Sequence, residues 1–166
     1  MSALQRLGGA TAWVSEARCV PESQESSRSR VMLVAVHSRA VLELEPGVMA
    51  NVAAARSFVL RTLADDVPDE VAADLQLATS ELVTNAYEHG ATAPVVVAVY
   101  VENGCASVSV RSHQRPGARV AEVADWSIAD PAQLAGRGLG IVRAIADDLE
   151  VATERSALTI TVHRKW

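Results

Sequence analysis

The segment of residues 75–90, LQLATSELVTNAYEHG, constrains this chain more than any other stretch. Its apolar residues recur with the spacing of one helical stripe, and its polar residues gather on an adjoining face. Glu81 and Asn85 stand one helical turn apart on that face, so a carboxylate and a carboxamide offer oxygens to the same small volume. A divalent cation or a water molecule could be held there. Solvated surface helices often carry Glu and Asn four residues apart, so this spacing alone does not establish a binding site.

A glycine-rich run, GRGLGI at residues 136–141, supplies that second signal. Apolar residues with helical spacing follow it, so the run is expected to open a helix. The free backbone N–H groups at the start of a helix form a natural phosphate site. A plain loop that precedes a helix has the same composition. The two segments together favour a site for a phosphate-bearing ligand.

Size and charge limit the function classes. The chain has 166 residues, of which 49% are hydrophobic, which is enough for one core and short for two. Its formal net charge of -5 provides no basic field, so nucleic acid is not an expected partner. Lys165 is its one lysine, which excludes a Gly-Lys-Ser/Thr phosphate loop. Phosphate ligands must therefore be backbone groups, arginine or a metal.

The cysteines and the N-terminal residues bear on location. Cys19 and Cys105 are far apart in the sequence and form no CxxC pair, which is consistent with reduced thiols. Polar residues and glycines interrupt the first 16 residues, so neither a signal peptide nor a membrane span is expected. We expect a cytoplasmic protein with no membrane partner.

The N-terminal half predicts a tail, strands and two helices. Residues 1–30 are expected to form a flexible segment with a short helix at its start, and residues 31–166 to form a single domain. Residues 31–36 and 40–44 have strand character. Helical spacing covers residues 48–63. Asp69 is a candidate N-cap for the helix that ends at Gly90.

The C-terminal half predicts a hairpin, a lid and a closing strand pair. Asn103-Gly104 separates two apolar strands, residues 95–101 and 106–110, and is a strong hairpin signal. Residues 113–135 lack periodicity and are expected to form a lid before the glycine run. Strands at residues 149–153 and 158–163 follow a helix that ends near Asp147. The order of elements predicts an α+β fold, a two-layer sandwich with helices on one face of a mixed, mostly antiparallel sheet.

The order of these motifs resembles the histidine-kinase-like ATPase superfamily, which has the Bergerat ATP-binding fold. A Glu-x-x-x-Asn helix, a hairpin, a lid and a Gly-Arg-Gly-Leu-Gly helix start follow one another over about residues 40–164. Within that superfamily the chain is most similar to the stand-alone actinobacterial anti-sigma-factor serine/threonine kinases. The resemblance implies ATP and Mg²⁺ as cofactors.

The resemblance also implies a role for each motif residue. Asn85 resembles the ligand of the Mg²⁺ ion that bridges the ATP phosphates, and Glu81 resembles the base that orients or deprotonates the attacking hydroxyl group. The loop that wraps the phosphates would consist of Gly136, Arg137, Gly138, Leu139 and Gly140. These groups suit phosphoryl transfer, which depends on positioning and on charge neutralisation.

Two positions depart from the family pattern. Ser112 stands where an aspartate accepts a hydrogen bond from the adenine amino group, and Ala157-Leu158 replaces a Gly-Thr pair that closes the adenine pocket. Loss of a charge-assisted hydrogen bond costs about 1.5–3 kcal/mol, or roughly 10- to 150-fold in affinity. Weak ATP binding, altered nucleotide preference and no nucleotide binding all stay open.

Two functions therefore follow from the sequence. The first is an ATP-dependent serine/threonine protein kinase that phosphorylates an anti-sigma-factor antagonist and, in its other state, holds a sigma factor. The second is a degenerate module that sequesters a regulatory protein without ATP hydrolysis or phosphotransfer. Retention of both Glu81 and Asn85 favours the first, and Ser112 favours the second. A homodimer through the N-terminal strands is a further hypothesis.

Overall fold

The structure is a computed structural model that describes residues 3–7, 10–14, 36–46, 48–116 and 137–166. Within these residues the chain forms strands and helices in the following order. The elements are β1 (Ala3–Leu7), β2 (Ala10–Val14), β3 (Val36–Leu44), α1 (Ala50–Leu63), α2 (Asp69–His89), β4 (Val95–Glu102), β5 (Cys105–His113), α3 (Arg137–Ile145), β6 (Asp148–Glu154) and β7 (Ala157–Lys165).

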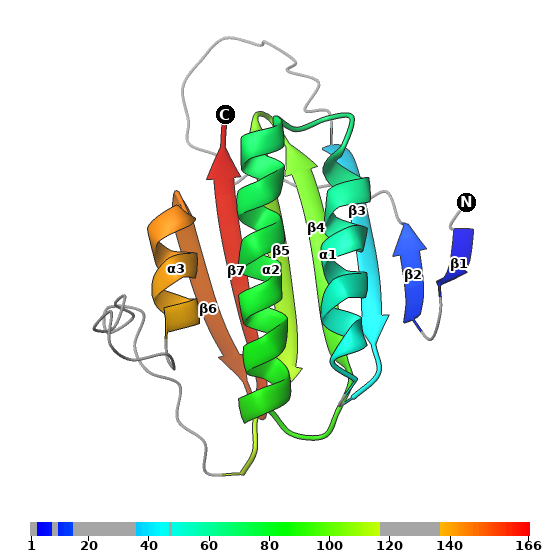
Figure 1. The fold of residues 1–166 in the computed structure, drawn as a ribbon, viewed down its shortest axis with the longest axis vertical. Helices are drawn as coiled ribbons and strands as arrows, with labels where there is room; N and C mark the ends of the chain where they lie inside the picture. Colours follow the sequence, from blue (N-terminus) through cyan, green and yellow to red (C-terminus); the bar gives the residue numbers. More distant parts are fainter. Residues whose placement is uncertain (1–2, 8–9, 15–35, 47, 117–136) are drawn as a thin grey trace, which may run out of the picture.

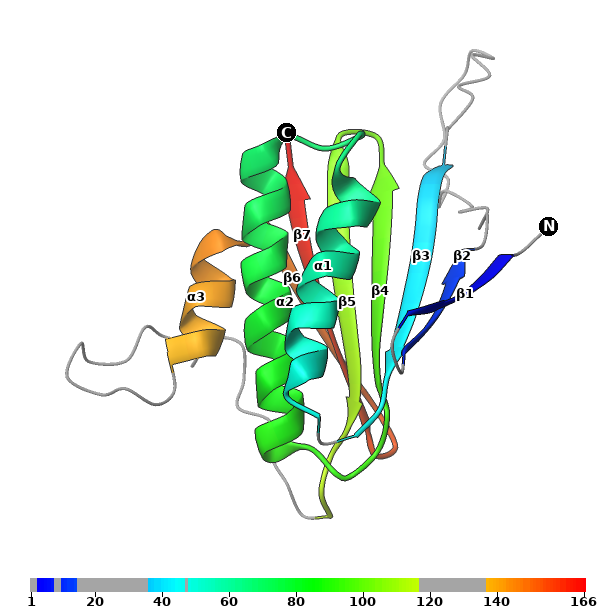
Figure 2. The same ribbon diagram turned by 45° about the vertical axis from the view of Figure 1, so that its right-hand side comes forward.

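The described strands form a 7-stranded sheet in the order β1-β2-β3-β4-β5-β7-β6 (Figure 1). Each strand pairs antiparallel with its neighbour. The three helices lie on one face of the sheet, with α2 between α1 and α3 (Figures 1 and 2). This arrangement confirms the predicted α+β sandwich.

The core lies between the helices and the sheet. Along β4, alternate residues Val95, Val97, Val99 and Val101 are buried because successive side chains of a strand point to opposite faces. Leu75 and Val83 on α2 are fully buried against this face. The apolar residues that recur with strand spacing in β4 and with helical spacing in α2 therefore pack against one another in one hydrophobic layer.

The hairpin between β4 and β5 forms at the predicted turn. Asn103 has φ 48° and Gly104 has φ 75°, which is the left-handed pair of a type I′ turn. Glu102 pairs with Cys105 across it. The Asn-Gly sequence therefore sets the register in which every later residue of β5 faces β4.

The N-terminal end of α2 differs from the prediction, and its C-terminal end agrees with it. Asp69 is the first residue of the helix, and Pro68 occupies the N-cap position without a side-chain cap hydrogen bond, so the prediction of Asp69 as N-cap is wrong. The carboxylates of Asp69 and Glu70 instead lie in the first turn, where they favour the positive end of the helix dipole. Gly90 ends the helix as predicted, and its N–H group donates to the carbonyl of Ala86.

Other expectations also change. The prediction of a short helix at the start of the chain is wrong, because the strands β1 and β2 lie there and β2 pairs with β3. α1 begins two residues later than predicted, and α3 ends at Ile145. Residues 31–35, most of the first predicted strand, and residues 117–136, most of the predicted lid, lie outside the described part of the chain. The flexible tail and the domain boundary at residue 31 stay predictions.

In the described part of the chain, no helix is both long enough and apolar enough to cross a membrane.

Candidate functional site

Asn85 lies in the C-terminal half of α2 and is half-buried. Its Nδ2 atom is shielded from solvent and has no hydrogen-bond partner among the residues that the structure describes. A buried donor without a partner costs about 1–3 kcal/mol, so such groups are rare unless they serve a function. Rotation of the amide by half a turn exchanges nitrogen and oxygen, so the same position offers a donor to a phosphate or an acceptor to a cation.

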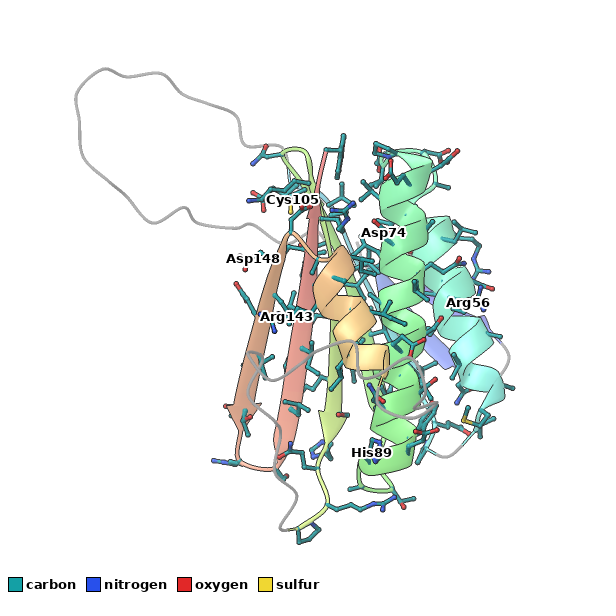
Figure 3. The ribbon with its side chains drawn as sticks, turned by 60° about the vertical axis from the view of Figure 1, so that its left-hand side comes forward. Arg56, Asp74, His89, Cys105, Arg143 and Asp148 are labelled. Atoms are coloured by element: carbon teal, nitrogen blue, oxygen red, sulfur yellow. The ribbon has the colours of Figure 1, made fainter. Side chains whose placement is uncertain are left out.

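Glu81 lies one turn before Asn85 and is also half-buried. A Cβ atom added to Gly138 would overlap the Glu81 carboxylate, so the first turn of α3 approaches this side chain closely. α3 lies beside α2 in the view of Figure 3, with His89 marking the C-terminal end of α2. The structure therefore brings the predicted base together with the glycine-rich helix start.

Gly138 and Gly140 lie in the first turn of α3. Gly140 is buried and Val142 is fully buried, while Leu139 is half-buried against the core. α3 thus packs beside α2 with its apolar residues against the core, and its first turn lies next to Glu81. Gly136 and the side chain of Arg137 lie outside the described part of the structure.

Ser112 and Leu158 are direct neighbours in the sheet. Ser112 on β5 pairs with Leu158 on β7, and Ser112 is only 9% exposed. Leu158 is half-buried and packs against the core from the same face. The two departures from the family pattern therefore lie side by side on the helix-covered face, and a ligand that contacts one would contact the other.

Arg115 ties the residues after β5 to the end of α2. Its Nε donates to the Gly90 carbonyl at 2.8 Å and its second guanidinium nitrogen donates to the Glu88 carbonyl at 3.1 Å. The N–H of Ala91 donates to the His113 carbonyl at 2.7 Å. An arginine beside a helix C-terminus satisfies carbonyl groups that the helix leaves free. Sequence reasoning missed this contact, because nothing along the chain shows that β5 ends next to α2.

A second network fixes α2 against the start of α1. Asn51 Nδ2 donates to the Glu45 carbonyl at 3.0 Å and to the Tyr87 hydroxyl at 3.2 Å, and that hydroxyl donates to the same carbonyl at 3.1 Å. Burial raises the pKa of Tyr87 above its ordinary value of 10.0, and the hydrogen bond from Asn51 opposes this shift. The turn of α2 that carries Asn85 is therefore held in place from both sides.

A sequence model described as a histidine kinase-like ATPase domain matches residues 46–163, well over half of the chain. The chain belongs to the histidine kinase-like ATPase family. The matched region contains Glu81, Asn85, Ser112 and the α3 glycines, so the family assignment and the geometry concern the same site. A search of curated proteins gives no match. For this histidine kinase-like ATPase domain, the predicted superfamily and fold are confirmed.

The donor set of the ATPase domain fits a magnesium nucleotide. Mg²⁺ prefers oxygen ligands, and in nucleotide sites it usually takes one or two from the protein and the rest from phosphates and water. The half-buried amide of Asn85 offers one such ligand, and the carboxylate of Glu81 lies one turn away. The backbone N–H groups at the start of α3 suit phosphate oxygens.

Proposed function

We propose that this domain binds ATP with Mg²⁺ between α2 and α3 and acts as a serine/threonine protein kinase of the anti-sigma-factor kind. One observation carries the proposal. The solvent-shielded Nδ2 atom of Asn85 has no hydrogen-bond partner among the described residues, and Asn85 lies one turn from Glu81 on the α2 face that the first turn of α3 covers. A ligand with a cation and phosphates satisfies all three groups at once.

Each group has one role in this proposal. Asn85 holds the cation, and the N–H groups of the first turn of α3 orient the phosphates. Glu81 accepts the proton of the attacking hydroxyl group or orients that group. The bound magnesium nucleotide supplies the phosphoryl group and neutralises its charge. Positioning, rather than covalent catalysis by the protein, then lowers the barrier.

The proposed protein substrate is an anti-sigma-factor antagonist with an accessible serine or threonine. In the other state of the switch the same protein holds a sigma factor, so phosphorylation of the antagonist decides which partner is bound and regulates transcription in the cytoplasm. A homodimer stays part of the proposal. The net charge of -5 accords with protein partners rather than nucleic acid.

The second candidate function is a module that sequesters a regulatory protein without phosphotransfer. The Ser112–Leu158 pair favours it, because a hydroxyl group replaces a carboxylate and a branched apolar side chain stands directly beside it. Such a pocket binds the base weakly or not at all, while the fold that presents the partner surface is unchanged.

Two measurements separate the candidates. Calorimetric titration with ATP, ADP and GTP in the presence of Mg²⁺ measures nucleotide binding. Incubation of the protein with radiolabelled ATP and a candidate anti-sigma-factor antagonist measures phosphate transfer to a serine or threonine of the antagonist. The kinase proposal expects micromolar ATP binding and labelling of the antagonist. Absence of heat with any nucleotide at millimolar concentration would favour the sequestering module.

A further inference from the structure

The face of the sheet opposite the helices carries a second cluster of reactive side chains. Tyr100 on β4 pairs with Ser107 on β5, and Ser107 pairs with His163 on β7, so the three residues form a row across the sheet. These residues help to line a cavity of about 400 Å³. The remaining lining residues are Glu102, Cys105, Ser109 and Thr161. Ser107 and Ser109 alternate along β5 with Ala106, Val108 and Val110 of the helix-covered core, so this face lies on the side of the sheet away from the helices. Figure 3 labels Cys105 at the start of β5.

Ser107 and His163 are closely hydrogen-bonded. Ser107 Oγ lies 2.7 Å from His163 Nδ1, and Ser107 is only 8% exposed. In the tautomer with hydrogen on Nε2, the serine hydroxyl donates to Nδ1, which is the arrangement in which a base activates a nucleophile. Ser107 is nonetheless one of the residues that line the cavity.

The other nitrogen of the imidazole faces a carboxylate. His163 Nε2 is shielded from solvent and has no hydrogen-bond partner among the described residues, and it lies 3.8 Å from Glu150 Oε1. The Glu150 side chain is 69% exposed and can move to close this gap. A carboxylate beside the second nitrogen stabilises the imidazolium that forms when the base takes a proton.

We propose that Ser107 is a nucleophile that accepts an acyl group from small activated esters, with His163 as its general base and Glu150 as a positioning residue. Ser107 Oγ forms a bond to the acyl carbon while His163 Nδ1 takes its proton. The ester C–O bond breaks, and the leaving oxygen receives that proton. Water then attacks the acyl-serine with proton transfer to His163, which releases the acid and restores the hydroxyl group.

The cavity offers hydroxyl groups to the developing oxyanion. Ser109 and Thr161 are cross-strand partners and lie in the row next to Ser107 and His163. Hydroxyl donors near the reacting carbon stabilise the negative charge of a tetrahedral intermediate. The proposed activity is independent of the kinase proposal, because it uses the opposite face of the sheet and needs no nucleotide.

Cys105 is the competing nucleophile. Its Sγ lies 3.9 Å from Ser107 Oγ, and the residue is partly exposed. Thiolates react readily with activated esters, so the site of acylation has to be identified by residue. The chain has a single lysine, Lys165, which limits acylation of other amines and makes the assignment clear.

The test is reaction of the full chain with p-nitrophenyl acetate near neutral pH, followed by mass spectrometry of the intact protein and of its peptides. The proposal expects one acetyl group on Ser107 and a burst of p-nitrophenol. Acetylation confined to Cys105, Lys165 or the N-terminus, with unmodified Ser107, would overturn it. The wild-type protein alone decides this point, whether or not the variants fold.

Variants then test the roles. Ser107→Ala and His163→Ala should each slow p-nitrophenol release about a hundredfold, because nucleophile and base act as a unit. Cys105→Ala removes the competing nucleophile and should leave the acetylation of Ser107 in place. Glu150→Gln should slow acylation about tenfold without lowering thermal stability, and Glu150→Asp should restore the rate. Equal rates in Glu150→Gln and the wild type would remove Glu150 from the mechanism.

Discussion

The carboxylate of Glu81 on α2 lies against the backbone of Gly138 on α3, and a Cβ atom added to Gly138 would push that carboxylate aside. This contact joins the predicted base to the predicted phosphate-binding turn. Glycine allows this close approach through its lack of a Cβ atom rather than through its backbone freedom, since the residue is helical. The contact therefore explains why a helix start tolerates a residue of poor helix propensity.

Gly138→Ala should change the free energy of unfolding by no more than about 1 kcal/mol, because the added methyl group meets the flexible end of the Glu81 side chain, which can turn aside, and alanine is the better helix former. Chemical denaturation measures the change. The same substitution in a Glu81→Ala background should raise stability by about 1 kcal/mol, since the overlapping group is gone and only the gain in helix propensity is left. An equal change in both backgrounds would show that the two residues do not interact.

Asn85→Ala should abolish Mg²⁺-dependent nucleotide binding without lowering stability. The Nδ2 atom it removes has no hydrogen-bond partner among the described residues, and alanine is the better helix former. Asn51→Ala is the matched control: it removes an amide that bonds to Glu45 and Tyr87, and should lower stability by about 1–2 kcal/mol while binding is retained. Thermal melts and calorimetry distinguish the two variants, and unchanged nucleotide binding by Asn85→Ala would contradict the assignment.

Glu81→Gln should retain nucleotide binding and lose phosphate transfer. The amide has the shape of the carboxylate but cannot accept a proton from the attacking hydroxyl group at neutral pH. A loss of about 10²–10⁴-fold in transfer rate with an unchanged dissociation constant is expected. Equal loss of binding and transfer would place Glu81 in ligand binding instead.

Ser112→Asp should tighten ATP binding by roughly 10- to 150-fold if the base pocket is open, because a carboxylate makes a charge-assisted hydrogen bond with the adenine amino group. Leu158 lies directly opposite. If Leu158 blocks the pocket, Ser112→Asp alone should change nothing, and Ser112→Asp combined with Leu158→Thr should restore binding. Calorimetric titrations of both variants with ATP and GTP make the comparison.

Asp147 should make stability sensitive to acid. Its carboxylate accepts from the Lys165 N–H at 2.8 Å and contacts Arg164 at 2.8 Å, and the backbone hydrogen bond is the main reason that its pKa falls below its ordinary value of 3.8. A depressed pKa contributes stability above pH 3.8 that is lost as pH falls through the lower folded-state value. In the Asp147→Asn variant, the free energy of unfolding should decrease less steeply than in the wild type as the pH falls below 3.8. The same pH dependence in both proteins would contradict this role of Asp147.

Local patterns in the sequence predict the local elements well. The helical stripe of α2 and the Asn103-Gly104 turn depend on neighbours in the chain, and both form as expected. The prediction places the N-cap at Asp69, one position too late, because Pro68 occupies that position without a side-chain cap hydrogen bond.

Contacts between distant segments are harder to predict. Ser107 and His163 are 56 residues apart, and they meet because β7 pairs with β5 while β6 lies at the edge. Arg115 reaches α2 for the same kind of reason. The proximity of Glu81 to Gly138 was predictable through the family resemblance, since neither residue indicates the other by spacing alone.

Calorimetric titration of the wild-type protein and of Asn85→Ala with ATP and Mg²⁺ tests the central claim most directly. The account predicts micromolar binding by the wild type that depends on Mg²⁺, and no measurable heat from a folded Asn85→Ala variant. No heat from the wild type at millimolar ATP, or equal binding by both proteins, would contradict the claim that the α2–α3 site holds a magnesium nucleotide.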